Sequence, residues 1–210
     1  MLSFVCPHPP YICPPEWFDY YAERDLPLPP QWRQGDWPAH PVIDHFRRFF
    51  DFHPQFEEPQ IRRLLAAYYG ACSFLDEQIG RVLTQLEALG LTQSTRVIYS
   101  SDHGEHLGGR GIFGKFSLYD ESAAVPMIAA GPDVPQGAVC RTPTSLVDLY
   151  PSIIESVGAE SHNDDAGLPG RSLWTIASNP DAQRTVLSEY HAVGSQHASY
   201  MIRDERYKYN

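Results

Sequence analysis

The sequence has no apolar run long enough to span a bilayer, and its start lacks the basic segment and apolar core of a signal peptide. Neither a membrane span nor a secretory leader is therefore predicted, and a cytoplasmic location is favoured. The four cysteines are scattered and form no Cys-x-x-Cys metal pattern. Thiols in a reducing cytosol are the simpler assumption for them. No internal repeat or low-complexity tract is present.

Positive charge is also scarce, because 16 Lys and Arg stand against 26 Asp and Glu, giving a formal net charge of −10. This balance argues against nucleic acid or an anionic membrane as a partner, since both require a basic surface. A metal ion and one lysine can still create a locally positive pocket in an acidic protein. With 210 residues, 42% of them hydrophobic, the chain is long enough for a substantial core.

The stretch 95–105 joins a short apolar run to a polar turn. Residues 97–99 (Val-Ile-Tyr) predict a buried strand. Asp102 and His103 follow it, and Gly104 allows a sharp turn behind them. Ligands in open α/β sheets gather at the carboxyl ends of strands, so this carboxylate and imidazole are candidate ligands of a divalent metal. A plain polar loop is the alternative.

Asp102 and His103 also open a longer pattern over residues 102–126. It runs Asp-His-Gly-Glu-x-Leu-Gly, continues through further glycines to Lys115, and ends in a Val-Pro pair. This pattern resembles the sulfatase family of the alkaline-phosphatase superfamily, in particular its choline-sulfatase-like and phosphonate-monoester-hydrolase-like branches. One position departs, because the family often has Arg before Val-Pro and this chain has Ala124.

The resemblance implies roles for four residues. Asp102 and His103 would bind the metal, Ca²⁺ or Mn²⁺, and Lys115 would contact the sulfate or phosphonate. Residues 7–11 resemble the family's Pro-His-x-Pro loop, in which the histidine, here His8, donates a hydrogen bond to the sulfate. We expect His8 and Lys115 to point into the same depression as Asp102. Such convergence of distant loop residues would indicate a functional site, because packing alone gives no reason for it. An ordinary loop histidine is the alternative for His8.

The fold prediction starts from a strong helical pattern over residues 59–89, which precedes the strand at 94–101. A helix, a turn and a strand are half of a βαβ crossover, so the strand at 94–101 is predicted to be central and parallel. The predicted class is α/β, a parallel-rich sheet sandwiched by helices as in alkaline phosphatase. Further strands are predicted at residues 2–6, 126–130, 185–190 and 199–203, with another starting at 206–209.

Two domains are predicted. Residues 1–180 would form a partial sulfatase α/β domain, and residues 181–210 the truncated start of a small antiparallel carboxy-terminal subdomain. Residues 14–60 are rich in proline and aromatic residues and predict a long excursion of turns and short helices. Its tryptophans are interpreted as packing residues, with a cation–π box for a choline-like group as the alternative.

The resemblance also reveals what is missing. Sulfatases need a nucleophile in Cys/Ser-x-Pro-x-Arg, converted to formylglycine, and no such motif occurs; Cys13 begins Cys-Pro-Pro-Glu-Trp, with Trp17 in place of Arg. The paired aspartates of the family's metal site are absent too. We expect a fragment or partial gene whose true amino terminus is missing. Two ligands are too few for a hard divalent cation.

Three functions are therefore considered. The first is a fragment of a metal-dependent sulfuric-ester hydrolase, inactive by itself. The second is the same site acting on phosphonate monoesters or phosphodiesters, and the third is a non-catalytic module that has lost its nucleophile. The expected partner is a small-molecule sulfate or phosphonate ester, and a homo-oligomer is left open.

Overall fold

The molecule, described by a computed structural model for residues 1–52 and 56–210, divides into two units. The first unit comprises residues 1–93 and 105–116, and the second comprises residues 94–104 and 117–210. The chain therefore leaves the first unit after α3, returns to it for one loop, and leaves again. Among the described residues, no helix combines the length and apolar character that crossing a bilayer requires.

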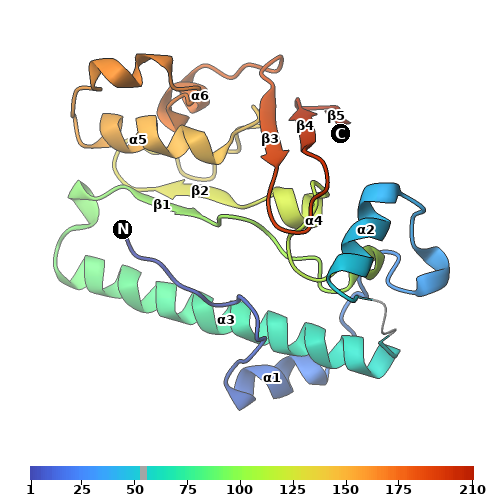
Figure 1. Ribbon diagram of the computed structural model, residues 1–210. Coiled ribbons are helices and arrows are strands. Elements are labelled where there is room, and N and C mark those ends of the chain that lie inside the picture. Colours follow the sequence, from blue (N-terminus) through green and yellow to red (C-terminus); the bar gives the residue numbers. More distant parts are fainter. Residues whose placement is uncertain (53–55) are drawn as a thin grey trace. The chain divides into compact units, whose positions relative to one another are not determined.

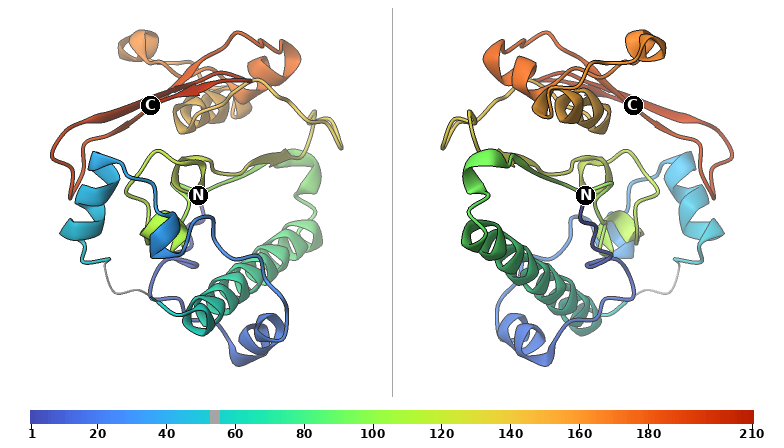
Figure 2. Two further views of the ribbon diagram at one scale, coloured as in Figure 1. Left: turned by 90° about the vertical axis from the view of Figure 1, so that its right-hand side faces the viewer. Right: turned by 90° about the vertical axis from the view of Figure 1, so that its left-hand side faces the viewer.

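The first unit is helical. It contains α1 (Pro15–Ala22), α2 (Pro41–Phe49) and α3 (Glu58–Ala88), with short 3₁₀ turns at η1 (Gln34–Asp36) and η3 (Gly109–Gly111). Figures 1 and 2 show α1 lying along α3. The predicted helix over 59–89 is confirmed.

Two features of the sequence fix where α3 begins. Glu57 and Gln60 form a reciprocal capping box, and Pro59 occupies the first turn, where no amide hydrogen is needed. The buried residues lie in the amino-terminal half of the helix, at Ile61, Leu65, Ala66, Gly70 and Ala71.

The second unit holds two small sheets and the remaining helices. The first sheet pairs β1 (Val97–Ser100) with β2 (Met127–Ala130), and the second has the order β3 (Val186–Tyr190), β4 (Ser199–Arg203), β5 (Lys208–Tyr209). Helical segments of this unit are α4 (Asp120–Ala123), η4 (Leu146–Asp148), α5 (Leu149–Ser156), η5 (Asn163–Gly167) and α6 (Leu173–Ser178), and η2 (Thr92–Ser94) leads into it. Figure 1 shows β3 and β4 as a hairpin.

The predicted strands at 126–130, 185–190 and 199–203 are thus confirmed, and 208–209 adds the last one. Two strand predictions are wrong. Residues 2–6 form no strand, because their side chains are mostly exposed and the prolines that follow remove ladder donors. The strand at 94–101 is not parallel: Val97 pairs with Ala130 and Ser100 with Met127, in antiparallel register. Because residues 2–6 form no strand, the predicted βαβ crossover through α3 lacks the strand that was expected before the helix.

All strand pairs among the described residues are antiparallel, so the parallel-rich sheet is not observed in this chain. The predicted boundary near residue 180 stays a prediction.

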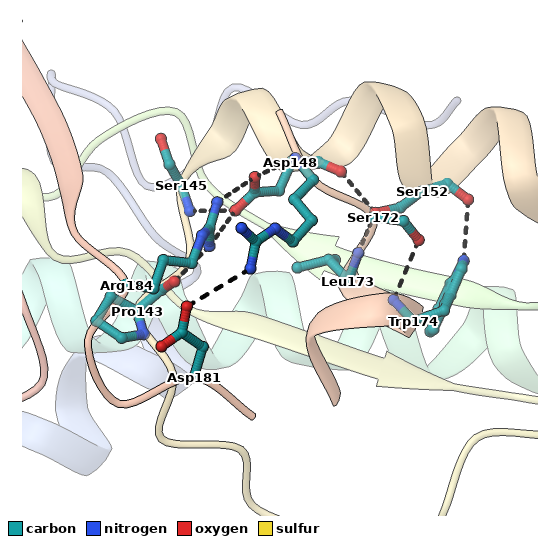
Figure 3. A network of polar contacts seen from close by, with 10 residues as sticks. Pro143, Ser145, Asp148, Ser152, Ser172, Leu173, Trp174, Asp181 and Arg184 are labelled. Carbon is teal, nitrogen blue, oxygen red and sulfur yellow. Dashed lines mark hydrogen bonds and ion pairs between the residues drawn. The ribbon is translucent and has the colours of Figure 1, made fainter. Parts of the chain in front are cut away.

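A buried ion pair organises the second unit (Figure 3). The Asp148 side chain is fully buried, and its two oxygens accept hydrogen bonds from the Arg184 guanidinium at 2.7 and 3.0 Å. The amides of Ser145 and Arg171 also donate to this carboxylate, each at 2.8 Å. Because every donor is charged or a backbone amide, the buried charge is fully compensated. The network joins the start of α5 to the segment before β3.

Candidate active site

His8 and Lys115 meet in the first unit. The Nζ atom of Lys115 lies 2.9 Å from Nε2 of His8. The other ring nitrogen, Nδ1, lies 2.8 Å from the carbonyl oxygen of Pro9, which can only accept. The ring hydrogen is therefore assigned to Nδ1, and the ammonium donates to the lone pair of Nε2. The expected proximity of these two residues is observed. The depression that they are expected to share with Asp102 and their catalytic roles stay predictions.

Lys115 follows a loop, residues 105–114, that is closed at its base. The amide of His106 donates to the carbonyl of Gly114 at 3.0 Å. The Oε1 atom of Glu105 accepts from the amide of Gly114 at 2.6 Å and from that of Leu107 at 3.1 Å. The backbone position next to Lys115 is therefore fixed by a side chain and by a backbone bond.

The far end of this loop is held by the proline-rich segment and by α2. The amide of Arg110 donates to the carbonyl of Pro30 at 2.9 Å, and the buried guanidinium of Arg47 donates twice to the carbonyl of Arg110. Gly111 has φ +69°, and a Cβ atom there would lie 2.3 Å from the ring of Trp37. Only glycine accommodates both the conformation and the contact. Trp37 is thus a packing residue, as predicted.

The segment that carries His8 contacts the same loop through Tyr11. Burial raises the pKa of Tyr11 well above its ordinary value, and so do the charge of Glu105 and a hydrogen bond to it. The Tyr11 ring also packs edge-on against Tyr68 of α3, with ring centroids 5.7 Å apart. Glu105 is part of the motif in the sequence, but the motif by itself gives no sign of this contact.

Asp102 and His103 lie in the second unit, after the end of β1. The amide of His103 donates to Oδ1 of Asp102 at 3.0 Å, and the Oγ atom of Ser101 donates to the His103 carbonyl at 2.8 Å. Nδ1 of His103 lies 2.9 Å from the Gly104 carbonyl, which assigns the ring hydrogen to Nδ1. Nε2 then faces Oδ2 of Asp102 at 3.4 Å.

This pair suits a shared cation. Two ligands at right angles and about 2.2–2.4 Å from one ion lie about 3.1–3.4 Å apart. The carbonyl bond at Nδ1 also fixes the ring in the tautomer that a metal needs at Nε2. Among the described residues, however, no group of three or more His, Cys, Asp or Glu side chains could hold a metal. Asp102 and His103 therefore fit two positions of a coordination shell and do not complete one.

Gly104 shows why the turn behind the pair needs a glycine. A Cβ atom at this position would lie 2.1 Å from the carbonyl oxygen of Glu121, and the amide of Gly104 donates to the carbonyl of Ser122 at 2.7 Å. The backbone approach holds the Asp102-His103 turn against the segment that begins α4. The glycine identified in the sequence is required by this close approach.

Comparison with solved structures identifies the fold. The chain superposes on the phosphonate monoester hydrolase of Silicibacter pomeroyi with a TM-score of 0.77 and 28% sequence identity, over 99% of this chain and 46% of that one. The chain therefore has the α/β fold of the alkaline-phosphatase superfamily.

Sequence comparison narrows this class. The Sulfatase profile matches residues 1–159, and the chain belongs to the sulfatase family, whose members are hydrolases. The choline-sulfatase of Rhizobium meliloti (strain 1021) is 30% identical over 212 residues, 99% of this chain and 41% of the relative. Human arylsulfatase K is 33% identical over 164 residues, 74% of this chain and 30% of the relative. The chain thus spans well under half the length of these relatives.

Proposed function

We propose that this chain forms part of a metal-dependent hydrolase of small-molecule sulfate esters. The observation that carries the proposal is the contact between Lys115 and His8, which joins a cation and an imidazole from two loops far apart in the sequence. A sulfate ester carries negative charge on its oxygens and gains more on the leaving oxygen as it is cleaved. A fixed ammonium beside a proton-carrying group meets both needs.

In this proposal, Lys115 contacts the sulfuryl oxygens. Its ammonium also donates to Nε2 of His8, so a hydrogen that His8 gives to the leaving oxygen is one that Lys115 first passes to Nε2, which leaves the lysine neutral. His8 is oriented for this by its Nδ1 bond to the Pro9 carbonyl.

Asp102 and His103 would hold a divalent cation, Ca²⁺ or Mn²⁺, which when bound supplies positive charge opposite the ester oxygens. The donor set is one carboxylate and one imidazole. Ca²⁺ takes oxygen ligands in proteins, so the imidazole favours Mn²⁺ of the two.

The nucleophile and the further metal ligands are not supplied by these residues. The sequence contains no Cys/Ser-x-Pro-x-Arg motif, and the chain spans 41% of the choline-sulfatase it matches. We therefore expect residues 1–210 to be one part of the enzyme and to be inactive alone. Loss of a nucleophile commonly costs several powers of ten in rate.

Phosphonate monoesters or phosphodiesters are the second candidate substrates. The structural relative from Silicibacter pomeroyi, named as a phosphonate monoester hydrolase, is 28% identical to this chain. Sulfate and phosphonate esters are both tetrahedral anions, and the same cations serve either. A non-catalytic module is the third candidate.

The test compares residues 1–210 with the protein expressed from its complete reading frame. Both are assayed with an aryl sulfate and an aryl phosphonate monoester, with Mn²⁺ or Ca²⁺ added. We expect turnover only from the complete protein, lost in Lys115→Ala, His8→Ala and Asp102→Ala and kept in Glu77→Ala, an exposed position on α3. The preferred ester decides between the first two candidates, and a complete protein inactive on both supports the third. Turnover by residues 1–210 that depends on Asp102 would contradict the proposal and make Cys13 the first nucleophile to mutate.

A further inference from the structure

Helix α5 of the second unit presents a line of apolar side chains outward. Val147 in η4, Tyr150 and Ile153 in α5, and Val157 at its carboxyl end are 49%, 42%, 53% and 70% exposed. We call these four residues the α5 stripe. At about 100° per residue, the last three lie within an arc of about 60° around the helix axis. The stripe is therefore one aligned apolar surface.

The opposite side of α5 is buried and polar. Asp148 and Ser152 are fully buried there, the first in its ion pair with Arg184 (Figure 3). The Oγ atom of Ser152 donates to the carbonyl of Asp148 at 2.5 Å and accepts from the amide of Leu173 at 2.8 Å. Nε1 of Trp174 donates to the Ser152 carbonyl at 3.0 Å. A surface helix normally turns its apolar residues toward the core, so the arrangement of α5 is the reverse of the usual one.

The buried side fixes the orientation of the helix. Turning α5 to bury the stripe would break the ion pair of Asp148 and expose the bonds of Ser152, and breaking a buried ion pair is strongly destabilising. Single exposed apolar residues are common on protein surfaces, whereas an aligned set marks an interaction surface. The α5 stripe is therefore held outward, in position to pack against another apolar surface.

We propose that the α5 stripe packs against apolar side chains of the remaining polypeptide of the complete enzyme. This inference rests on the part of the proposed function that makes residues 1–210 one part of a longer hydrolase. The Silicibacter pomeroyi hydrolase superposes on 99% of this chain, which covers only 46% of that relative. More than half of the relative's polypeptide therefore lies outside the matched part of the fold, and chain of that length can supply the covering surface.

Charge disfavours two other occupants of the stripe, an anionic membrane and a second copy of this chain. Asp165 accepts a hydrogen bond from the Tyr150 hydroxyl at 2.5 Å, and Asp164 beside it is 90% exposed, so the stripe has an acidic border. This border and the net charge of −10 would repel an anionic membrane. Two-fold pairing of the stripe with itself would bring two acidic borders together.

The first test measures the accessibility of the stripe in the complete protein and needs no activity. Ile153→Cys and Val157→Cys are compared with Val139→Cys, whose natural side chain is 81% exposed in the same unit. Cysteine suits these positions because it behaves as a small apolar residue. Each variant reacts with a maleimide, natively and in concentrated urea. Mass spectrometry of the peptide that carries the new thiol gives its rate separately from those of the natural cysteines.

In the monomeric complete protein, we expect the thiols of Ile153→Cys and Val157→Cys to react at least about tenfold more slowly than in urea, and that of Val139→Cys within about threefold of its rate in urea. Rapid reaction of a stripe thiol in the folded monomer, or equal protection at Val139→Cys, would overturn the inference. Protection only at concentrations that give a dimer would assign the stripe to a second copy. Protection only with phosphatidylcholine vesicles would assign it to lipid. Either assignment also overturns the inference.

The second test places a charge in the stripe. In the complete protein, Ile153→Lys should lower the urea midpoint of unfolding by at least about 0.5 M, because packing against the stripe would bury an unpaired ammonium. Ile153→Leu should keep the natural midpoint, and Val139→Lys is the matched control. Equal midpoints for Ile153→Lys and Val139→Lys would overturn the inference.

Turnover of the two esters tests the proposed function separately. A complete protein that hydrolyses neither ester but protects the stripe thiols contradicts the proposed function and supports the packing of α5. A complete protein that hydrolyses an ester while its stripe thiols react rapidly supports the proposed function and contradicts the packing.

Discussion

Lys115 donates a hydrogen bond to His8 across 107 positions of sequence, with 2.9 Å between Nζ and Nε2. The direction of this bond follows from the other side of the imidazole, where Nδ1 is committed to the Pro9 carbonyl. One ammonium hydrogen of Lys115 is therefore directed at the lone pair of Nε2 of His8.

This hydrogen bond predicts that the two residues act as a unit. In the complete protein, His8→Ala and Lys115→Ala should each lower kcat/KM, and the double variant should lose about as much as the worse single one. Residues in contact show interaction energies of about 0.5–3 kcal/mol in such cycles. A cycle of Lys115→Ala with Glu77→Ala should be additive. Additive losses for His8 and Lys115 would contradict this coupling.

The glycine at the far end of the Lys115 loop makes a prediction about stability. Gly111→Ala combines a left-handed backbone with a Cβ atom 2.3 Å from the Trp37 ring. It should therefore lower the free energy of unfolding by about 1–3 kcal/mol in urea titrations. Gly35→Ala is the matched control, because no atom lies within 4 Å of its added Cβ. Equal stability of the two variants would show that the loop relaxes freely.

The buried pair of the second unit makes a larger prediction. Asp148→Ala leaves the Arg184 guanidinium, whose side chain is only 10% exposed, without its carboxylate (Figure 3). Breaking a buried pair in this way costs about 3–5 kcal/mol. Asp164→Ala, whose side chain is 90% exposed, should change the unfolding free energy by less than about 0.5 kcal/mol. The same denaturant titration compares them, and similar midpoints would refute the role of Asp148.

The ion pairs of Asp120 predict that the stability of the protein depends on pH. The hydrogen bond from Lys208, with that from Arg203, lowers the pKa of Asp120 against the opposing effect of partial burial. A lowered pKa in the folded state contributes stability above the unfolded pKa of about 3.9, and this stability is lost as the pH falls through the folded value.

Asp120→Asn should therefore destabilise the protein at pH 7, and the difference from the natural protein should vanish as the pH falls below about 4. The carboxylate is 55% exposed, so the effect is expected to stay under about 1 kcal/mol. Lys208→Met should cost little once Asp120 is replaced. A difference that is constant from pH 3 to pH 7 would exclude the ion pairs as its cause.

The features that the sequence predicted correctly are local ones. Helix α3 is predicted by apolar residues that recur every three or four positions and by Pro59 in its first turn. The strands at Val186–Tyr190 and Ser199–Arg203 are runs with β-branched or aromatic residues between turns. The Asp102-His103 turn was located because its residue types are adjacent in the chain.

The features that the sequence could not give depend on partners far away. The pattern of β1 is the same whichever direction its partner runs, so its antiparallel pairing with β2 was not predictable. The bond between Asp148 and Arg184 joins residues 36 positions apart. In the sequence, Glu105 is one residue of the motif, and nothing in the sequence shows that Tyr11 and Gly114 face its carboxylate.

The closed base of the loop at residues 105–114 has a consequence for recognition. Its amides at His106, Leu107 and Gly114 are already bonded within the loop, so an anion reaching Lys115 meets a backbone that has little conformational freedom left to lose. Ordering a rotamer-rich side chain at a binding site costs about 0.5–1.5 kcal/mol, and an ordered backbone avoids the larger cost of fixing the chain itself. The entropy of assembling this part of the site is thus lost during folding, before any anion binds.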